Sequence, residues 1–502
     1  MLEMLSAGFS EMLTIYTMSL IFIGVAMGLV FGSIPGLTAT MAVAICLPIT
    51  FTMSPSDGMA LLMGLYIGGV SGGLIPAILL KLPGTPSSIS STFDGYPMAQ
   101  KGQAGKAFGL AIVFSFLGGL LSIATLILIA PPLAQFAVRF GPIEYFAITV
   151  FALTLISSLS DGSIVKGILA ALIGISLAMV GSAPIDAFPR FTFGMNALDA
   201  GFNLLPALIG LFAISEFLKT SESKVNPLVK KISYKIKGFG FSVAEFFKQG
   251  WNFFRSAFIG IAIGILPGIG GGTANIIAYA TAKNQSKHPE EFGKGTPEGV
   301  VASESSNNAA VGGALVPLMA LGIPGDTVTA MLLGGLVIHG IQPGPLFFTS
   351  NTDIVYGIFA ALIIANIAML VFLFLGMRFF VKLLSIPKHI LLPIILVLCV
   401  VGAFGVNNRL FDVWALLFFG VLGYLLIKLK FPLTPVILGF ILGPIAETNL
   451  RRGLMQTQGD FLPFFTEPIA VFFFGVAIVS VGLKIWKNHR KKQTEINISG
   501  GV

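Results

Sequence analysis

Long apolar runs, separated by short polar stretches, make up most of this chain. Polar residues do not recur every third or fourth position within the runs, so the helices they predict are apolar all round. Each run approaches the roughly 20 residues that a helix needs to cross about 30 Å of hydrocarbon. The clearest runs are 107–130, 143–156, 353–375, 390–404, 413–427 and 469–483. The pattern predicts an all-α polytopic membrane protein with roughly 10 to 14 membrane segments, some of them half-crossings.

A spaced motif inside these runs occurs twice. Gly28, Gly32, Pro35 and Gly36 are matched, with identical spacing, by Gly260, Gly264, Pro267 and Gly268. Two further matches pair Pro76 and Pro83-Gly84 with Pro317 and Pro324-Gly325, and Phe202, Pro206 and Gly210 with Phe431, Pro435 and Gly439. We therefore predict a membrane repeat at 1–218, a basic cytoplasmic linker at 219–250, a second repeat at 251–450, and an extra C-terminal helix with a basic tail at 467–492.

Loop charge suggests how the two repeats are oriented. The loop at 181–199 carries Asp186 and Asp199 against Arg190 alone, whereas its counterpart near 427–431 carries Lys428 and Lys430. Because basic loops favour the cytoplasmic side, equivalent loops are expected on opposite sides of the membrane, which predicts inverted repeats. Parallel repeats remain the alternative, since loop charge is only a bias. The basic tail places the C-terminus in the cytoplasm.

Composition removes several classes of function. Of 502 residues, 55% are hydrophobic and 10% charged, and the mean hydropathy is +0.92. The net charge of +8 comes from loop clusters rather than from a basic face interleaved with aromatics, so no nucleic-acid binding is expected. Cys46 and Cys399 lie in apolar runs, the four histidines have no metal spacing, and no GxxxxGK[ST] loop is present. We expect no metal, no cofactor, no catalytic residues and no cleavable signal peptide.

Four Pro-Gly pairs interrupt the apolar runs, at residues 35–36, 83–84, 267–268 and 324–325. Proline removes an amide donor, and glycine accepts backbone angles that other residues avoid. In hydrocarbon the freed backbone groups cost several kcal/mol each, so such re-entrant or discontinuous helices persist only where protein or an aqueous cavity satisfies them. We expect the four breaks to converge, with helix N-termini forming an anion site.

Small polar residues after each break are the predicted ligand contacts, because hydroxyls and amides suit carboxylate oxygens. A single Pro-Gly pair is more simply read as a kink, but four pairs in matched positions favour a site. The GxxxG spacing of Gly28/Gly32 and Gly260/Gly264 is assigned to helix packing. The predicted substrate-binding residues are Gly36, Thr38, Thr40, Gly84, Thr85, Ser87, Gly268, Gly271, Gly272, Thr273, Asn275, Gly325, Thr327, Asn307 and Asn308.

Three acids are candidates for ion coupling: Glu304, Asp326 and Asp94. Glu304 and Asn308 lie four residues apart on one helical face, and a carboxylate at membrane depth indicates function. The alternative for this polar run is a loop or a solvated helix start. Asp326 could cap the helix that follows it or bind a cation. The sequence does not choose between H⁺ and Na⁺.

Several long motifs resemble the large membrane subunit of the tripartite tricarboxylate transporters. In the first half these are GSIPGLTATM at 32–41, IPAILLKLPGTP at 75–86 and DGYPMA at 94–99; in the second half they are LPGIGGGTAN at 266–275, EGVVASESSNN at 298–308 and GIPGD at 322–326. The resemblance implies a bacterial inner-membrane system that takes up di- or tricarboxylates by using an ion gradient. A smaller membrane subunit and a periplasmic solute-binding protein would be its partners.

The expected activity is therefore secondary active uptake of a citrate-like anion by alternating access, with an elevator-like movement preferred over rocking. A stand-alone carrier without a binding protein is the nearest alternative. A channel would show no stoichiometric coupling, and an enzyme would need a nucleophile, base or metal cluster that the sequence lacks. The oligomeric state is not determined by the sequence.

Overall fold

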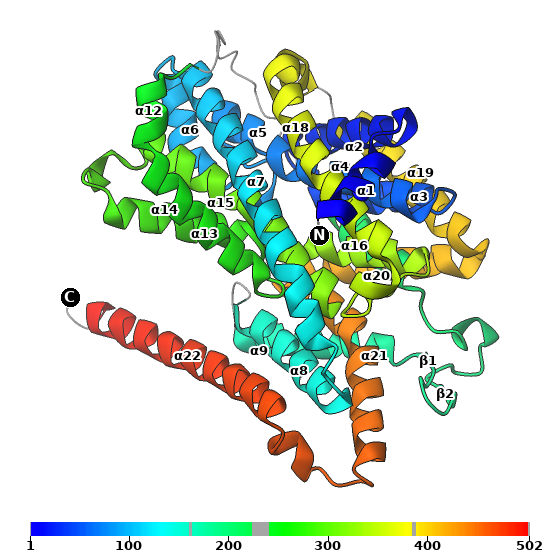
Figure 1. Cartoon of the computed structure of the whole chain (residues 1–502). Coiled ribbons are helices and arrows are strands. Elements are labelled where there is room, and N and C mark those ends of the chain that lie inside the picture. Colours follow the sequence, from blue (N-terminus) through cyan, green and yellow to red (C-terminus); the bar gives the residue numbers. More distant parts are fainter. Residues whose placement is uncertain (1, 160–162, 223–239, 384–387, 500–502) are drawn as a thin grey trace. The chain divides into compact units, whose positions relative to one another are not determined.

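The computed structural model describes residues 2–159, 163–222, 240–383 and 388–499, which are almost entirely helical (Figure 1). Strands within this part are limited to the antiparallel pair β1 (Gly181–Ser182) and β2 (Pro189–Arg190). Seven of its helical segments are long and apolar enough to cross a membrane, and six shorter helices are also apolar. The prediction of an all-α polytopic membrane protein is confirmed.

The chain forms two compact units. The larger unit comprises Met1–Ala137 and Leu205–Tyr424, and the smaller comprises Val138–Leu204 and Leu425–Val502, so each draws on both predicted repeats. The larger unit contains α1 (Leu2–Met12), α2 (Ile15–Ser33), α3 (Ala39–Thr50), α4 (Pro55–Gly72), α5 (Leu74–Leu80), η1 (Pro86–Ser88), α6 (Ser91–Gln100), α7 (Ala104–Ala137), α10 (Leu204–Ile209), η3 (Gly210–Ile214), α11 (Ser215–Glu222), α12 (Val243–Lys248), α13 (Gly250–Ile265), α14 (Gly270–Gln285), η4 (Pro289–Glu291), α15 (Pro297–Leu321), α16 (Thr327–Ile338), α17 (Phe347–Ser350), α18 (Thr352–Leu383), α19 (Lys388–Asn407) and most of α20 (Leu410–Lys428).

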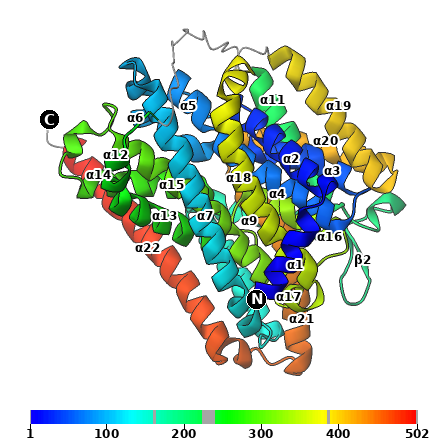
Figure 2. The ribbon, with the colours of Figure 1, turned by 45° about the horizontal axis from the view of Figure 1, so that its top comes forward.

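Two glycine-lined helix pairs form the frame of the larger unit, α2 with α4 and α13 with α15 (Figure 2). A Cβ on Gly28 would lie 2.5 Å from the carbonyl oxygen of Leu65, and one on Gly260 would lie 2.3 Å from that of Ser306. Only glycine permits such close approach, so the packing role expected of the GxxxG spacing is confirmed. Successive glycines of α2 meet successive turns of α4 from Leu61 to Gly69, so these two helices run in the same direction.

The smaller unit is built on α21 (Leu433–Gln456), which packs against α8 (Pro142–Leu159) and α9 (Ile164–Ala178). Its remaining helices are η2 (Asn196–Leu198), η5 (Leu462–Phe465) and α22 (Pro468–Ser499), the last of which is the extra C-terminal helix expected from the sequence. Glu447 of α21 accepts from Arg190 Nη1 at 2.7 Å and from Arg451 Nη2 at 3.0 Å, which ties the β2 strand to α21.

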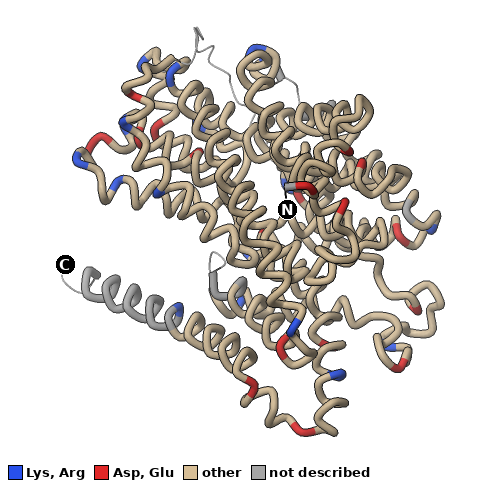
Figure 3. Tube along the Cα trace, in the orientation of Figure 1, with Lys and Arg blue, Asp and Glu red and all other residues tan. Residues whose placement is uncertain are grey.

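Charged residues gather at helix ends and in loops, and most helical turns carry none (Figure 3). Lys106 at the start of α7 forms an ion pair with Glu245 of α12. The basic residues Lys224, Lys230, Lys231, Lys235 and Lys237 of the predicted linker lie outside the described residues. No lysine, arginine or histidine in the described part of the chain is fully buried.

Candidate functional site

All four Pro-Gly pairs separate one helical element from the next, as the sequence predicts. Helix α2 ends at Ser33 and α3 begins at Ala39; α5 ends at Leu80 and η1 begins at Pro86; α13 ends at Ile265 and α14 begins at Gly270; α15 ends at Leu321 and α16 begins at Thr327. Gly36 has φ 95° and Gly268 has φ 75°. Both values lie in the left-handed region, which glycine adopts without a steric penalty.

The four breaks lie close together within the larger unit. Thr40, after the first break, lies 3.0 Å from Thr327, after the fourth, between their hydroxyl oxygens. A Cβ on Gly270, after the third break, would lie 3.0 Å from Asp326 Cβ. The third break also meets the second, because Asn275 Nδ2 donates to the Ser87 carbonyl at 2.6 Å. The predicted convergence is therefore observed, with each break in contact with at least one other.

Half-exposed residues mark the part of this cluster that a ligand can reach. Among the predicted contacts they are Gly36, Thr38, Ser87, Gly268, Gly271, Gly272, Thr273, Asp326 and Thr327. Gly84 and Gly325, in contrast, are buried by close packing. A Cβ on Gly84 would lie 2.2 Å from the carbonyl oxygen of Gly32, and one on Gly325 would lie 2.5 Å from Ala314 Cα.

Several predicted ligand contacts are already engaged in holding the elements together. Asn275 Oδ1 accepts from the Ser90 hydroxyl at 2.6 Å, in addition to its bond to Ser87. Thr38 caps α3 by accepting from the Met41 amide at 3.2 Å. Thr85 begins η1, where it and Ser88 form a capping box. These side chains position the backbone of the cluster.

The polar run of the second half lies within a buried helix. Residues 299–320 of α15 are all buried, so the alternative of a loop or a solvated helix start is wrong for this run. Glu304 accepts from the Ser91 hydroxyl and, at 2.9 Å, from the Ser115 hydroxyl. Asn308 accepts from Ser71 at 2.7 Å and donates to the Glu304 carbonyl at 3.2 Å. Two hydroxyls, with the Asn307 carboxamide beside them, thus face a carboxyl group that is wholly removed from solvent, and no cationic side chain does.

Asp326 both caps α16 and lies within the cluster of breaks. Its Oδ1 accepts from the Thr329 amide at 2.7 Å, and its Oδ2 accepts from the Tyr66 hydroxyl at 2.7 Å. The capping role expected of Asp326 is confirmed.

Asp94 lies at one end of α15 rather than at the breaks. Its Oδ1 accepts from the amides of Gly293, Gly295 and Thr296, and its Oδ2 accepts from the Tyr279 hydroxyl at 2.8 Å. These hydrogen bonds hold the loop before α15 against α6. They give Asp94 a structural role.

Sequence reasoning did not identify Tyr66, Ser71, Ser91 and Ser115, the donors to Asp326, Asn308 and Glu304. None of the four lies inside one of the sequence motifs described above. Their partners are between 189 and 260 residues away in the chain, so no local spacing could have revealed them.

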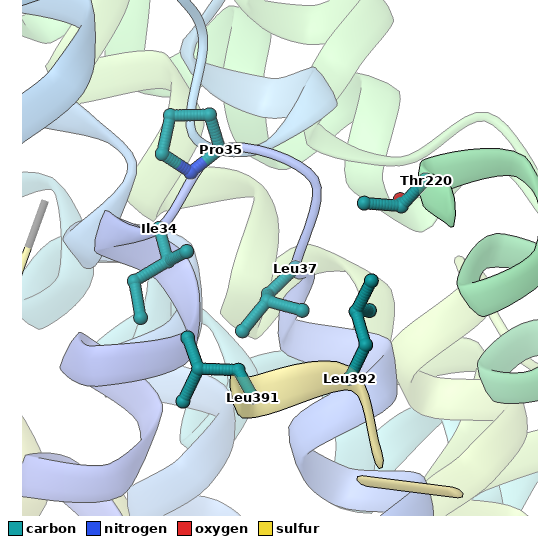
Figure 4. Close-up of a pocket in the computed structure, with 6 residues that line it drawn as sticks. All are labelled: Ile34, Pro35, Leu37, Thr220, Leu391 and Leu392. Carbon is teal, nitrogen blue, oxygen red and sulfur yellow. The ribbon is translucent and has the colours of Figure 1, made fainter. Parts of the chain in front are cut away.

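A small apolar pocket lies beside the first break (Figure 4). It is lined by Ile34, Pro35, Leu37, Thr220, Leu391 and Leu392. Thr220 points its hydroxyl to the Gly36 carbonyl at 3.4 Å, which supports the carbonyl that the break leaves free. The lining offers a carboxylate no charged donor.

The chain is similar to known membrane-transport proteins. The model of the tripartite tricarboxylate transporter TctA family matches residues 18–438. An uncharacterized 52.8 kDa protein of Agrobacterium vitis, from the TAR-I ttuC' 3' region, is 37% identical over 493 residues, which cover 98% of each chain. A second Agrobacterium vitis protein, from the TAR-II ttuC' 3' region, is 39% identical over 237 residues, covering 47% of this chain and 98% of that protein. No solved structure matches the chain.

Proposed function

Because the chain belongs to the TctA family of tripartite tricarboxylate transporters, we propose that it carries out ion-gradient-driven uptake of a di- or tricarboxylate such as citrate. The observation that carries the proposal is the convergence of four helix breaks, with half-exposed glycines and hydroxyls, in a unit among whose described residues no lysine, arginine or histidine is fully buried. Helix N-termini and neutral donors can compensate a carboxylate without a buried lysine or arginine.

The coupling cation is H⁺ or Na⁺, and the contacts favour Glu304 and Asp326 over Asp94 as the groups that bind it. Asp94 accepts four hydrogen bonds from a loop and a tyrosine. Glu304 accepts from two hydroxyls and faces the Asn307 carboxamide. Asp326 is half-exposed beside α14. A cation carried with the substrate offsets about 2.3 kcal/mol per charge per 100 mV when an anion moves inward against a negative-inside potential.

Helix directions support an inverted relation between the repeats. Helix α6 runs in the same direction as α5. Gly73, before α5, contacts Ser88, before α6, and Ile78, within α5, contacts Gly95, within α6. Helix α15 runs opposite to α6, since Asp94 meets Gly299 and Ser91 bonds to Glu304. As α4 continues into α5, α4 and α15 run in opposite directions, which is the relation expected of inverted repeats.

An elevator-like movement is the proposed form of alternating access. All four breaks belong to the larger compact unit, and the smaller unit contains none of them. A substrate bound at the breaks would then travel with one body of the protein.

A smaller membrane subunit and a periplasmic solute-binding protein are the proposed partners, beside the lipid bilayer itself. The multi-pass chain is assigned to the bacterial inner membrane, with its C-terminus in the cytoplasm because of the basic residues that end α22.

Reconstitution tests the proposal against its rivals. The chain and the small subunit are placed in vesicles, and uptake of radiolabelled citrate is measured with and without a binding protein, under an imposed H⁺ or Na⁺ gradient. Saturable uptake that requires the binding protein and one gradient is expected. Uptake without the binding protein would instead support a stand-alone carrier, and flux that no gradient can drive uphill would support a channel.

A further inference from the structure

The four helical elements that begin after the breaks differ in how their first amides are satisfied. Three are capped by their own side chains: Thr38 caps α3, Thr85 and Ser88 cap η1, and Asp326 caps α16. Helix α14 alone has no side-chain cap, because its N-cap residue is Ile269. An uncapped helix in a membrane protein leaves backbone donors that need another partner.

The open donors belong to Gly270, Gly271 and Gly272, the first three residues of α14. Within the described residues, none of these three amides donates to a protein acceptor. Gly271, Gly272 and Thr273 are half-exposed, so a ligand can approach them. The absence of side chains on the glycines lets an acceptor come close to the backbone.

A buried side chain faces this turn, and its polar neighbour on α15 is Glu304. Asn307 of α15 is 1% exposed, and neither Oδ1 nor Nδ2 makes a hydrogen bond of ordinary geometry. Its Oδ1 lies 3.1 Å from the position that a Cβ on Gly271 would occupy. An unsatisfied buried amide is costly, so its presence beside open backbone donors indicates that a ligand completes the set.

We propose that the first turn of α14 and the Asn307 carboxamide form the subsite for one carboxylate group of the substrate. The amides of Gly271 and Gly272 supply neutral donors, and the positive end of the α14 dipole supplies the field. The Asn307 carboxamide, whose Oδ1 faces Gly271 in this structure, adds its NH₂ as a further donor when it turns about its Cβ–Cγ bond. This assignment rests on the proposed function. It restricts the contact with this carboxylate group to one of the four breaks. The other three breaks then serve as structural supports.

Asp326 does not satisfy these donors, although it lies nearby. Its Cβ is 3.0 Å from the Cβ position of Gly270, but its two oxygens accept from Thr329 and Tyr66. A substrate carboxylate at α14 places a second negative charge beside Asp326. Binding of the coupling cation near Asp326 therefore strengthens substrate binding, because it removes this repulsion.

Asn307 also faces the Glu304 carboxylate from the next turn of α15, without a hydrogen bond of ordinary geometry. If Asn307 served Glu304 alone, its replacement would alter the cation dependence and leave the intrinsic affinity for substrate unchanged. The two roles are therefore separable by measuring citrate binding at a saturating cation concentration.

The test uses the full chain in lipid nanodiscs, with citrate as the probe and calorimetry as the readout. Asn307→Asp replaces a donor with an acid of equal size, and the Kd for citrate is expected to rise about 10- to 100-fold, the effect of losing one hydrogen bond to a charged group. Gly271→Ala, which would place a methyl 3.1 Å from Asn307 Oδ1, is expected to weaken binding in the same direction. Asn366→Asp is the matched control, because Asn366 is equally buried, also has an unpartnered Oδ1, and lies on α18.

Citrate affinity lowered by both site variants, and unchanged in Asn366→Asp, would support the subsite. Wild-type affinity in Asn307→Asp and Gly271→Ala, in folded protein, would overturn it and leave the proposed transport function intact. Should wild-type protein bind neither citrate nor any other di- or tricarboxylate, with transport also absent, both the function and the subsite would be rejected.

Discussion

Helices α4 and α15 hold matched positions in the two halves of the chain, with α4 packed on the glycines of α2 and α15 on those of α13. Where α4 reads Met63 to Ile67, the stretch of α15 placed by the Pro76/Pro317 match runs from Glu304 to Asn308. The first stretch serves close packing: a Cβ on Gly64 would lie 2.6 Å from the Ile21 carbonyl oxygen. The second carries a carboxyl group and two amides away from solvent.

The glycine packing of the backbone is therefore present in both halves, whereas the carboxyl group and the amides of α15 have no counterpart in this stretch of α4. Buried polar groups in a membrane protein are expensive, so a polar run is expected where function needs it. The glycine frame places the breaks in both halves, and α15 then adds the acid and the amides in one half only. Variants at matched positions can therefore separate the shared frame from the unshared chemistry.

The largest effect is expected at the breaks, where the halves are alike. Gly36→Val and Gly268→Val each place a β-branched side chain at a positive φ, which costs about 1–2 kcal/mol and displaces the break. Both variants are expected to insert into the membrane and to lose citrate transport in the vesicle assay. Gly102→Val is the control, because Gly102 has φ 78° with no atom within 4 Å of its Cβ position and lies between α6 and α7. Normal transport by either break variant would show that the broken helices do not form the site.

The next effect belongs to α15 alone. Glu304→Gln keeps one of the two oxygens that accept from Ser91 and Ser115, replaces the other with an NH₂ group, and removes the ionisable group. We expect the variant to lose uphill accumulation of citrate under either gradient while still binding citrate. Glu298→Gln, the same change in the first turn of α15, is expected to accumulate citrate normally. A gradient-driven uptake by Glu304→Gln equal to that of wild type would remove Glu304 from coupling.

Substitution of Asp326 can separate its role as a helix cap from its proposed role in cation coupling. Asn is as good an N-cap as Asp, so Asp326→Asn is expected to cost less than about 1 kcal/mol of stability. Because the charge is lost, the dependence of uptake on the coupling cation is expected to weaken several-fold. The measurement is initial uptake against cation concentration, with Asp57→Asn at the start of α4 as the control. An unaltered cation dependence would leave Asp326 with capping alone.

Much of this arrangement could be predicted from the sequence, and the missing part has a physical cause. The four breaks follow from Pro-Gly pairs, and the shared face of Glu304 and Asn308 follows from their spacing, since both are local properties of the backbone. The side chains that donate to Glu304 and to Asp326 could not be predicted. Ser91 lies 213 residues from Glu304 and Tyr66 lies 260 residues from Asp326, so these contacts exist only once the two halves interlock. Which of the predicted contacts are engaged in capping likewise depends on that interlocking.

The smallest expected effect concerns one of those unpredicted donors. Tyr66→Phe removes the hydroxyl that donates to Asp326 at 2.7 Å and changes little else. The loss of one such bond costs about 1–2 kcal/mol, which should appear as a lower melting temperature in a thermal-shift assay. Tyr279→Phe is closely matched, because its hydroxyl donates to Asp94 at 2.8 Å at the end of α15. Both variants should lose similar stability, but only Tyr66→Phe should shift the cation dependence of uptake, since only Asp326 lies among the breaks. An equal shift in Tyr279→Phe would mean that stability, rather than the position of Asp326, sets the cation dependence.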